Sequence, residues 1–544
     1  RGREETVVRA SLLWTPTDRL SVYAKVESAE FQESGLNLQM VRVGPGLLPL
    51  YLAADPAFES RLDKQTSKSP EDTDTDTQNA VLSIEYAPGG ALEGFTVTSV
   101  TGYSAFDNLD NRDTDWSPLD LIHQSLRRDF EQISQELRLT SPTGGAVDYI
   151  VGLYYQANDY DSAGSTSIDL SAFGFPPPFG VETTMRGALE QKSDTLSAFA
   201  QATWHINESV RLIGGVRYTD ETKEATEGSC FGSGRGSFQC LDPVADPAAF
   251  ATANLVFPII GFFEHQFDNL KRSEEDFSPS LALQWDVNDD VMLYTSWVKG
   301  FKAGGFNGNN SSGNPNDVEF EEEQATSFEV GGKTTWLDGV AQLNFALFST
   351  SYEDLQVSTF SGTGFTVGNA AEATIRGLEI DGIWRITEKL TVNGAVGWLD
   401  TEYDSYAGAA CTYEQTYLAA PGCIGGLQDR TGQDVTEKDL SASLGVEYET
   451  SVGSGLMLSS RLDMNYDKSF QGESDPDYVD PYVIVNARVA LSDDEESWSI
   501  ALIGKNLTDE DHHDTLFDAP AQAGSRVASL TSPRTIAIQA SYNF

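Results

Sequence analysis

The sequence predicts an all-β protein, a transmembrane antiparallel β-barrel with about 19 strands present. Three observations favour this fold class. Apolar and polar residues alternate along short segments, short turns alternate with long polar loops, and aromatic residues gather near segment ends. A strand of ~9–11 residues can cross a bilayer at a tilt, and it shows only half of its side chains to lipid. A mean hydropathy of −0.31 is therefore compatible with a membrane protein of this kind.

Alternation with a period of two residues is the main signal. Over 455–466, one face carries Leu456, Leu458, Leu462, Met464 and Tyr466, while Ser459, Arg461, Asp463 and Asn465 occupy the other. The segments 377–386, 440–449 and 535–544 alternate in the same way. A strand gathers such residues on one face, whereas a helix would scatter them around its circumference. The polar face would line the lumen, with the charged residues Glu379, Asp381, Arg385, Arg461, Asp463 and Arg488.

Connections between these segments alternate between short and long. The short turns fall at 15–18, 87–93, 141–147, 205–209, 286–290, 336–339, 386–389, 451–455 and 492–497. The long polar loops extend over 31–77, 105–128, 160–191, 221–275, 302–322, 352–372, 402–437, 468–480 and 508–533. Short periplasmic turns and long extracellular loops are typical of outer-membrane barrels. Aromatic residues near strand ends, such as Trp14, Tyr154, Trp204 and Trp285, would form the interfacial girdle.

Charge and composition disfavour several classes of function. The chain has 83 acidic and 35 basic residues, a formal net charge of −48. Nucleic acid is therefore not expected as a partner, because phosphate neutralisation needs clustered Lys and Arg. The longest apolar run, 255–263, is too short for a membrane-spanning helix. None of the five histidines shows an evident arrangement with a serine and a carboxylate, so we expect neither an enzyme nor a cofactor.

The four cysteines form two near pairs, Cys230 with Cys240 and Cys411 with Cys423, each inside a long polar loop. We expect two loop disulfides, which form in an oxidising compartment. The alternative is four free thiols. Zinc binding is disfavoured because no histidine lies at ligand spacing from either pair.

The predicted strand count is odd, whereas single-chain bacterial barrels have an even number. The last segment alternates up to Phe544, and an aromatic last residue resembles the signal that the barrel-assembly machinery reads. No signal peptide is present. We therefore expect residues 1–544 to form one barrel domain that is incomplete at its N-terminus.

Several segments together resemble the TonB-dependent receptor family. REETVVRASLLWTPTDRLSVY (3–23) resembles an early barrel hairpin, and YTSWVKGFKAGGFNG (294–308) a mid-barrel strand with its glycine-rich loop. The segments 320–358 and 367–404 resemble the two hairpins that follow. SIALIGKNLTDEDHHD (499–514), followed by PRTIAIQASYNF, resembles the C-terminal pair of strands. The motifs are most similar to the siderophore-receptor branch of the family.

The resemblance implies a barrel of the 22-stranded receptor type around a plug domain. Neither the plug nor the short box that pairs with TonB is visible in this chain. It further implies an outer-membrane receptor whose loops capture a ferric siderophore, and three kinds of partner. These are the TonB–ExbB–ExbD complex acting through the plug, outer-membrane lipid and lipopolysaccharide, and the small-molecule ligand. The alternatives are TonB-dependent uptake of a glycan, cobalamin or aromatic compound, and a passive porin.

Two kinds of local feature are candidates for binding. The aromatic loop FGFPPPFG (173–180) offers a ligand-contacting surface through Phe173, Phe175 and Phe179, and the alternative is a proline-stiffened loop that packs on its neighbours. The acidic segments 71–76, 319–323 and 509–514 contain potential metal ligands but lack the spacing of a defined site. We interpret these three segments as solvated loops and expect no bound metal.

Overall fold

The structure is a computed structural model. It describes residues 2–35, 38–61, 71–177, 180–308, 310–360, 365–411, 415–416, 420–435, 438–453, 455–469, 481–495, 497–520 and 522–543.

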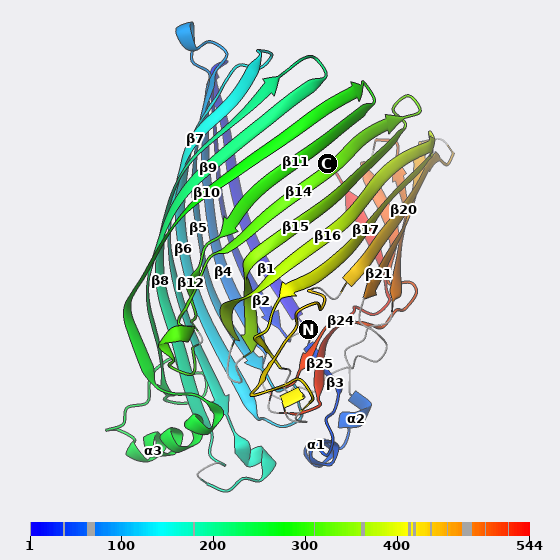
Figure 1. Cartoon of the computed structure of the whole chain (residues 1–544). Coiled ribbons are helices and arrows are strands. Elements are labelled where there is room, and N and C mark those ends of the chain that lie inside the picture. The colour runs from blue at the N-terminus through cyan, green and yellow to red at the C-terminus, as the bar shows by residue number, and fades with distance from the viewer. Residues whose placement is uncertain are drawn as a thin grey trace.

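One antiparallel sheet of 19 strands dominates the described residues and curves into a barrel wall (Figure 1), as the sequence predicts. Its strands are β1 (Gly2–Thr17), β2 (Leu20–Ser34), β4 (Asp72–Tyr86), β5 (Thr96–Asp113), β6 (Ile122–Thr140), β7 (Val147–Ile168), β8 (Thr183–His205), β9 (Val210–Gly232), β10 (His265–Asn288), β11 (Val291–Lys302), β14 (Glu323–Trp336), β15 (Ala341–Phe360), β16 (Phe365–Thr387), β17 (Leu390–Ser405), β20 (Lys438–Ser451), β21 (Leu456–Ser469), β22 (Tyr482–Asp493), β23 (Trp498–Lys505) and β26 (Thr535–Tyr542). Each strand pairs with the next in this order.

The smaller elements lie in the connections. They are β3 (Leu38–Arg42), α1 (Leu48–Ala54), α2 (Phe58–Arg61), η1 (Gly90–Leu92), η2 (Leu170–Phe173), α3 (Pro247–Val256), η3 (Phe257–Ile260), β12 (Gly305–Phe306), η4 (Pro315–Asp317), β13 (Glu319–Phe320), β18 (Ala409–Ala410), β19 (Leu427–Gln428), β24 (His513–Asp518) and β25 (Arg526–Leu530). No helix among the described residues is long and apolar enough to cross a membrane.

The two ends of the sheet are unpaired edges. In the described part of the chain, β1 pairs only with β2, and β26 pairs only with β23. Because all neighbouring strands are antiparallel and the sheet has 19 of them, β1 and β26 run in the same direction. An antiparallel sheet can close between two such edges only through an odd number of further strands.

The strands extend further out than the sequence predicts. β7, β8, β9 and β10 have 22 to 24 residues, more than the ~9–11 that cross a bilayer. The predicted loops 105–128, 160–191, 221–275 and 352–372 are therefore too long. The last of them is replaced by a hairpin with only 361–364 between its strands, and the acidic segment 71–76 lies almost wholly in β4. The part of a strand that lies outside the membrane has water on both sides and needs no apolar face. The apolar–polar alternation therefore fades there, although the backbone hydrogen bonds between the strands continue.

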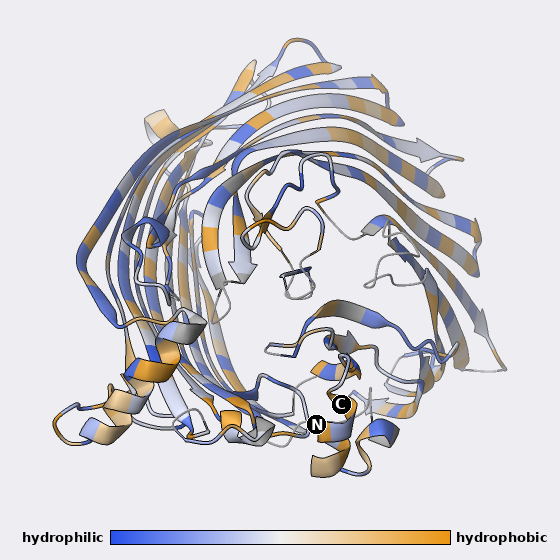
Figure 2. Ribbon diagram, turned by 60° about the horizontal axis from the view of Figure 1, so that its bottom comes forward, coloured by the Kyte–Doolittle hydropathy of each residue, from blue (hydrophilic) through white to orange (hydrophobic). Residues whose placement is uncertain are grey.

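Side chains alternate between an outer and an inner face. Leu153 is 56% exposed and Trp285 is 48% exposed on the outer face, which lipid would cover. The inner face is polar: the Asn344 amide donates to Asp381 across the strand pair at 2.9 Å, and the Arg461 guanidinium pairs with Asp463 at 2.8 Å. Along most strands hydrophobic and hydrophilic residues alternate visibly (Figure 2).

One residue of the predicted aromatic girdle, Tyr154, does not face lipid. It lies on the inner face, opposite to Leu153 and Tyr155, and the Arg217 guanidinium stacks over its ring at 5.3 Å. The run Leu-Tyr-Tyr contains aromatic residues of both parities, so the sequence alone did not decide which tyrosine faces lipid.

Candidate functional site

The described connections at one end of the barrel pack into compact assemblies. This end carries α1, α2, α3 and the small sheet of β3, β24 and β25, whereas only short turns occupy the opposite end (Figure 1). In the view into this end, ribbons of the connections lie within the ring of strands (Figure 2). The long connections therefore narrow the mouth of the barrel.

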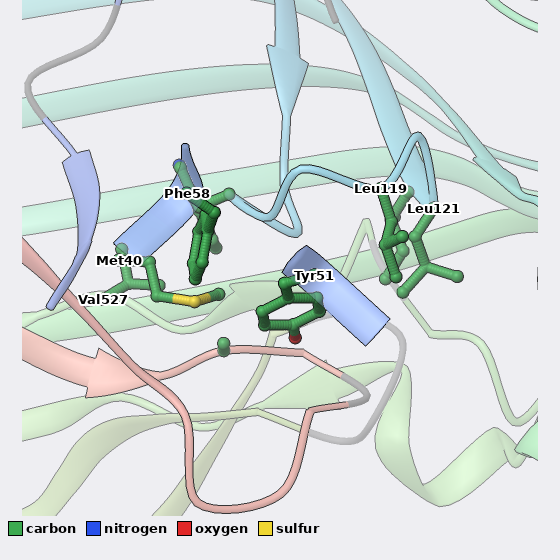
Figure 3. Close-up of a cluster of buried hydrophobic side chains, with 9 residues drawn as sticks. Met40, Tyr51, Phe58, Leu119, Leu121 and Val527 are labelled. Atoms are coloured by element: carbon green, nitrogen blue, oxygen red, sulfur yellow. The ribbon is translucent and has the colours of Figure 1, made fainter. Parts of the chain in front are cut away.

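The first assembly, which we call the cap, joins connections from both edges of the sheet. It comprises residues 38–61, 114–122 and the described part of 506–534. β3 pairs with β25, although Met40 and Val527 are far apart in sequence. Its buried hydrophobic residues are Met40, Tyr51, Phe58, Trp116, Leu119, Leu121, Ile122, Ala519 and Val527. Six of them are labelled in Figure 3, where they come from the three connections and face one another.

Buried polar groups link the parts of the cap. Gln522 is fully buried, its amide donates to the Asp115 carbonyl at 2.8 Å, and it accepts a hydrogen bond from the Tyr51 hydroxyl. The Asp115 carboxylate accepts from the backbone N–H groups of Leu121 at 3.1 Å and Ile122 at 2.7 Å. Burial, followed by the charge of Asp113, raises the pKa of Asp115 well above its usual range. The cap is therefore held by specific buried contacts as well as by apolar packing.

A second assembly forms around Phe231 at the end of β9. Phe231 packs with Met185, Phe257 and Phe262, and its ring stacks on Phe257 at 5.6 Å. The same connection contains Arg235, whose guanidinium pairs with Asp120 at 2.9 Å and with Glu182. Arg235 thus ties three separate connections together.

The third assembly, which we call the shelf, is the connection between β11 and β14, residues 303–322 without 309. Phe306 and Val318 of the shelf are buried against Leu189 of β8 and Ala225 of β9. Side chains along a strand point alternately outward and inward. Leu189 is an odd number of positions away from Leu196, which is exposed on the outer face of β8, so Leu189 points inward. Ala225 of β9 is related in the same way to the exposed Tyr218. The shelf therefore lies against the inside of the barrel wall.

Charged residues of the wall fix the first part of the shelf. The Lys223 ammonium donates to the Gly304 carbonyl at 2.6 Å, and the Glu274 carboxylate accepts from the Gly304 N–H at 2.9 Å. Arg272 pairs with Glu274 and with Glu321 of the shelf, each at 2.5 Å. Gly304 itself has no room for a side chain, since a β-carbon there would lie 2.3 Å from the Phe320 carbonyl oxygen.

Two amide side chains, Asn307 of the shelf and Asn369 of β16, fix the opposite side of the shelf to β15 and β16. The Asn307 amide donates to the Val367 carbonyl at 2.9 Å and accepts from the Val367 N–H at 2.8 Å. Asn369 donates to the carbonyls of Glu321 and Asp354 and accepts from the Glu321 N–H at 2.6 Å. The ladder between β15 and β16 is irregular at Tyr352–Gln356. The shelf is thereby pinned between β8–β10 and the β15–β16 hairpin.

His265 at the start of β10 forms a buried pair with Glu227. Its Nε2 lies 3.1 Å from the Glu227 carboxylate, and its Nδ1 lies 2.8 Å from the Phe263 carbonyl. Burial opposes the charged imidazole, but the hydrogen bonds to Glu227 and Phe263 and the charge of Glu227 outweigh it and raise the pKa of His265. The raised pKa favours the protonated imidazole, whose charge would balance the fully buried Glu227 carboxylate.

The structure places the predicted site residues in different assemblies. Disulfides join Cys230 to Cys240 beside the Phe231 cluster and Cys411 to Cys423 in the β17–β20 connection. Phe173 ends η2, Phe175 is 51% exposed, and Phe179 lies outside the described residues. Whether this loop contacts a ligand stays a prediction.

The acidic segments that we weighed as metal sites do not gather ligands in the described part of the chain, where no group of three His, Cys, Asp or Glu side chains could hold an ion. In the segment 509–514, His512 stacks on Tyr482 with ring centroids 3.4 Å apart. Arg272 holds Glu319 and Glu321 of the segment 319–323.

The cap and the shelf contain residues that the sequence did not single out. The side chains of Gln522, Asn307 and Asn369 donate hydrogen bonds to carbonyl groups that lie 15 to several hundred positions away in the chain. An isolated amide residue carries no signal for such a contact. Around Asn307, the sequence indicated only a glycine-rich loop after a mid-barrel strand.

The amino-acid sequence matches a family model. Residues 34–507 match the family described as TonB dependent receptor-like, beta-barrel. The chain belongs to this family of TonB-dependent receptors. It is therefore an outer-membrane receptor barrel of Gram-negative bacteria, and the family consists of transport receptors and not of enzymes.

Curated relatives include receptors with named ligands. The chain is 24% identical to the pesticin receptor of Yersinia pestis over 309 residues, which cover 56% of this chain and 39% of that protein. It is 29% identical to a probable TonB-dependent siderophore receptor, PiuA, of Acinetobacter baumannii over 155 residues, 27% of this chain and 20% of the relative. The chain thus spans well under half the length of the curated relatives it matches.

Solved structures show the same fold. The ferric yersiniabactin uptake receptor FyuA from Yersinia pestis superposes with a TM-score of 0.73 at 16% identity, covering 100% of this chain and 71% of that one. The siderophore receptor PiuA from Acinetobacter baumannii gives 0.68 at 14% identity, covering 99% and 74%. At these identities the likeness concerns the fold.

Proposed function

We propose that this TonB-dependent receptor barrel imports a ferric siderophore, driven by TonB through a plug domain outside residues 1–544. The observation that carries the proposal is the match to receptors named for siderophores, in sequence and in fold. The geometry is compatible with it, since a wide sheet with a polar inner face opens into assemblies of long connections at one end. Such connections provide a place to capture a ligand larger than ordinary pore solutes.

We further propose that strands outside residues 1–544 close the barrel between β26 and β1. The parallel direction of these two edges requires an odd number of additional strands, and three would give 22. The long exposed edge of β1 supports this, because unpaired strand edges are a template for further pairing.

Labelled siderophore binding tests the function. Cells that carry the full gene should bind and accumulate radiolabelled ferric siderophore, and a gene deletion should abolish this accumulation until the gene is restored. Iron chelation should also raise expression of the protein. Unchanged expression under iron starvation, combined with induction by a carbon source, would contradict the siderophore proposal and favour uptake of a glycan or an aromatic compound.

A further inference from the structure

We propose that the mouth of this barrel selects its ligand by charge, so that cationic or uncharged chelates are admitted and polyanionic chelates are repelled. This inference rests on the proposed function as a chelate receptor and names the class of chelate. Three observations support it. The long connections are acidic, their described arginines already contact other groups of the protein, and the outer wall carries a row of acidic residues.

The long connections are far more acidic than basic. Their described residues lie within 35–61, 71, 114–121, 169–182, 233–264, 303–322, 406–435, 481 and 506–534. These described residues include 21 Asp and Glu against six Arg and no Lys. Clustered charge of one sign at a mouth with low-dielectric walls concentrates counter-ions and excludes co-ions.

The arginines of these connections are already engaged by the protein. Arg235, Arg526 and Arg534 form ion pairs with carboxylates of the same chain. Arg430 stacks over the Tyr403 ring at 5.2 Å, and Arg42 donates to the Gly524 carbonyl. These are all the arginines of the connections whose side chains the structure describes. Recognition of an anion needs guanidinium or ammonium groups that can turn their donors to it.

The shelf has the same character inside the mouth. It contains Asp317, Glu319, Glu321 and Glu322 and no Lys or Arg. Of the cations beside it, Arg272 is shared among Glu274, Glu319 and Glu321, and Lys223 pairs with Glu221 at 2.9 Å. One guanidinium therefore faces three carboxylates, and the local balance stays negative.

The outer wall adds to the negative field just beyond the apolar band. Six acidic residues stand directly opposite one another on consecutive strands from β2 to β8: Glu30, Asp76, Asp107, Asp129, Asp161 and Glu190. Arg127 pairs with Asp129 at 3.1 Å. Elsewhere at this end, burial and the charges of Asp400 and Asp439 raise the pKa of Asp434, as expected in a negative potential.

A polyanionic ligand would approach this mouth against repulsion, and the described arginines of the long connections are already engaged by the protein. A cationic ligand would be steered inward, with an association rate that falls as salt is added. An uncharged ligand would feel neither effect. Charge thus separates ferric chelates of similar size before they touch the inner wall.

A thiol-reactivity experiment on the full receptor measures the potential directly. A cysteine introduced as Phe175→Cys at the mouth, and Leu92→Cys on a short turn as the control, would each react with a cationic and an anionic methanethiosulfonate reagent. Relative to a small free thiol, the cationic-to-anionic rate ratio at position 175 should rise at least ~10-fold at low salt. It should exceed the ratio at position 92 and collapse near 1 M salt, where the Debye length is ~3 Å. A salt-independent ratio equal to that of the free thiol would overturn the proposal.

A matched set of ligands tests selection itself. Radiolabelled ferrioxamine B carries one positive charge, its N-acetyl derivative is uncharged, and its N-succinyl derivative carries one negative charge on the same scaffold. Receptor-dependent uptake should be fastest for the cation and slowest for the anion. The reverse order, or receptor-dependent uptake of a trianionic ferric catecholate, would contradict charge selection. If no ferric chelate enters through the receptor, the proposed function fails, while the thiol experiment still decides the charge of the mouth.

Discussion

Among single residues, Gln522 joins three connections of the cap. It lies between β23 and β26 and contacts Tyr51 of the β2–β4 connection and Asp115 of the β5–β6 connection. Gln522→Ala would leave the Tyr51 hydroxyl and the Asp115 carbonyl without this partner inside the cap. We expect a loss of ~1–3 kcal/mol in local stability of the cap. Hydrogen exchange of residues 38–61 should accelerate accordingly, whereas the control Gln201→Ala, at an exposed side chain of β8, should leave it unchanged. Equal protection in both variants would contradict the assigned role.

His265 gives the mouth a pH dependence with a definite sign. Its folded-state pKa is raised, so its contribution to stability is complete below the ordinary value of ~6.5 and is lost as pH rises through the higher folded value. Exchange protection near Phe263 should therefore fall on the alkaline side of that value. His265→Phe should abolish this pH dependence and leave Glu227 buried without its partner. Protection that increases with pH in the unaltered protein would be inconsistent with the raised pKa.

At the scale of elements, the shelf depends on the β15–β16 hairpin. Asn369→Ala would remove its bonds to Glu321 and Asp354. We expect a protease specific for glutamate to cleave within 319–323 about tenfold faster, the equivalent of ~1.4 kcal/mol. Asn316→Ala removes only the hydrogen bond that the Asn316 side-chain amide donates to the Asn314 side chain, within the shelf, and serves as the control. Unaltered cleavage in Asn369→Ala would show that the hairpin does not hold the shelf.

The spacing of the cysteines predicts two disulfides, each inside one of the predicted long loops. Digestion without reduction, followed by mass spectrometry, should yield linked peptides for Cys230–Cys240 and Cys411–Cys423. Replacing Cys230 and Cys240 by serine should cost about 2–4 kcal/mol of local stability around Arg235, because the closed loop restricts the unfolded chain. Free thiols in protein isolated from the outer membrane would refute the prediction.

At the scale of the whole molecule, the sequence predicts the sheet much better than the mouth. Period-two alternation determines strand number and face because each membrane strand has lipid on one side and a polar lumen on the other. It fails near Asp129 and Asp161, where strands continue into water and both faces are polar. The cap could not be predicted either, because Gln522 and Tyr51 meet only after the wall brings their connections together.

In the described part of the chain, the sheet ends in two unpaired edges, β1 and β26, with which other strands can pair. An experimental structure of the complete gene product should show an odd number of strands between β26 and β1. Residues 1–544 expressed alone should associate through these two edges, since unpaired edges recruit other strands. A direct pairing of β1 with β26, or an even number of intervening strands, would contradict the proposed closure.

We propose that the whole receptor is an energised importer. The most direct measurement is accumulation of radiolabelled ferric siderophore in cells that carry the full gene, with and without a functional TonB protein. We expect accumulation only when the receptor and TonB are both present. Receptor-dependent entry that persists without TonB and rises linearly with external concentration would identify a passive pore and contradict energised import.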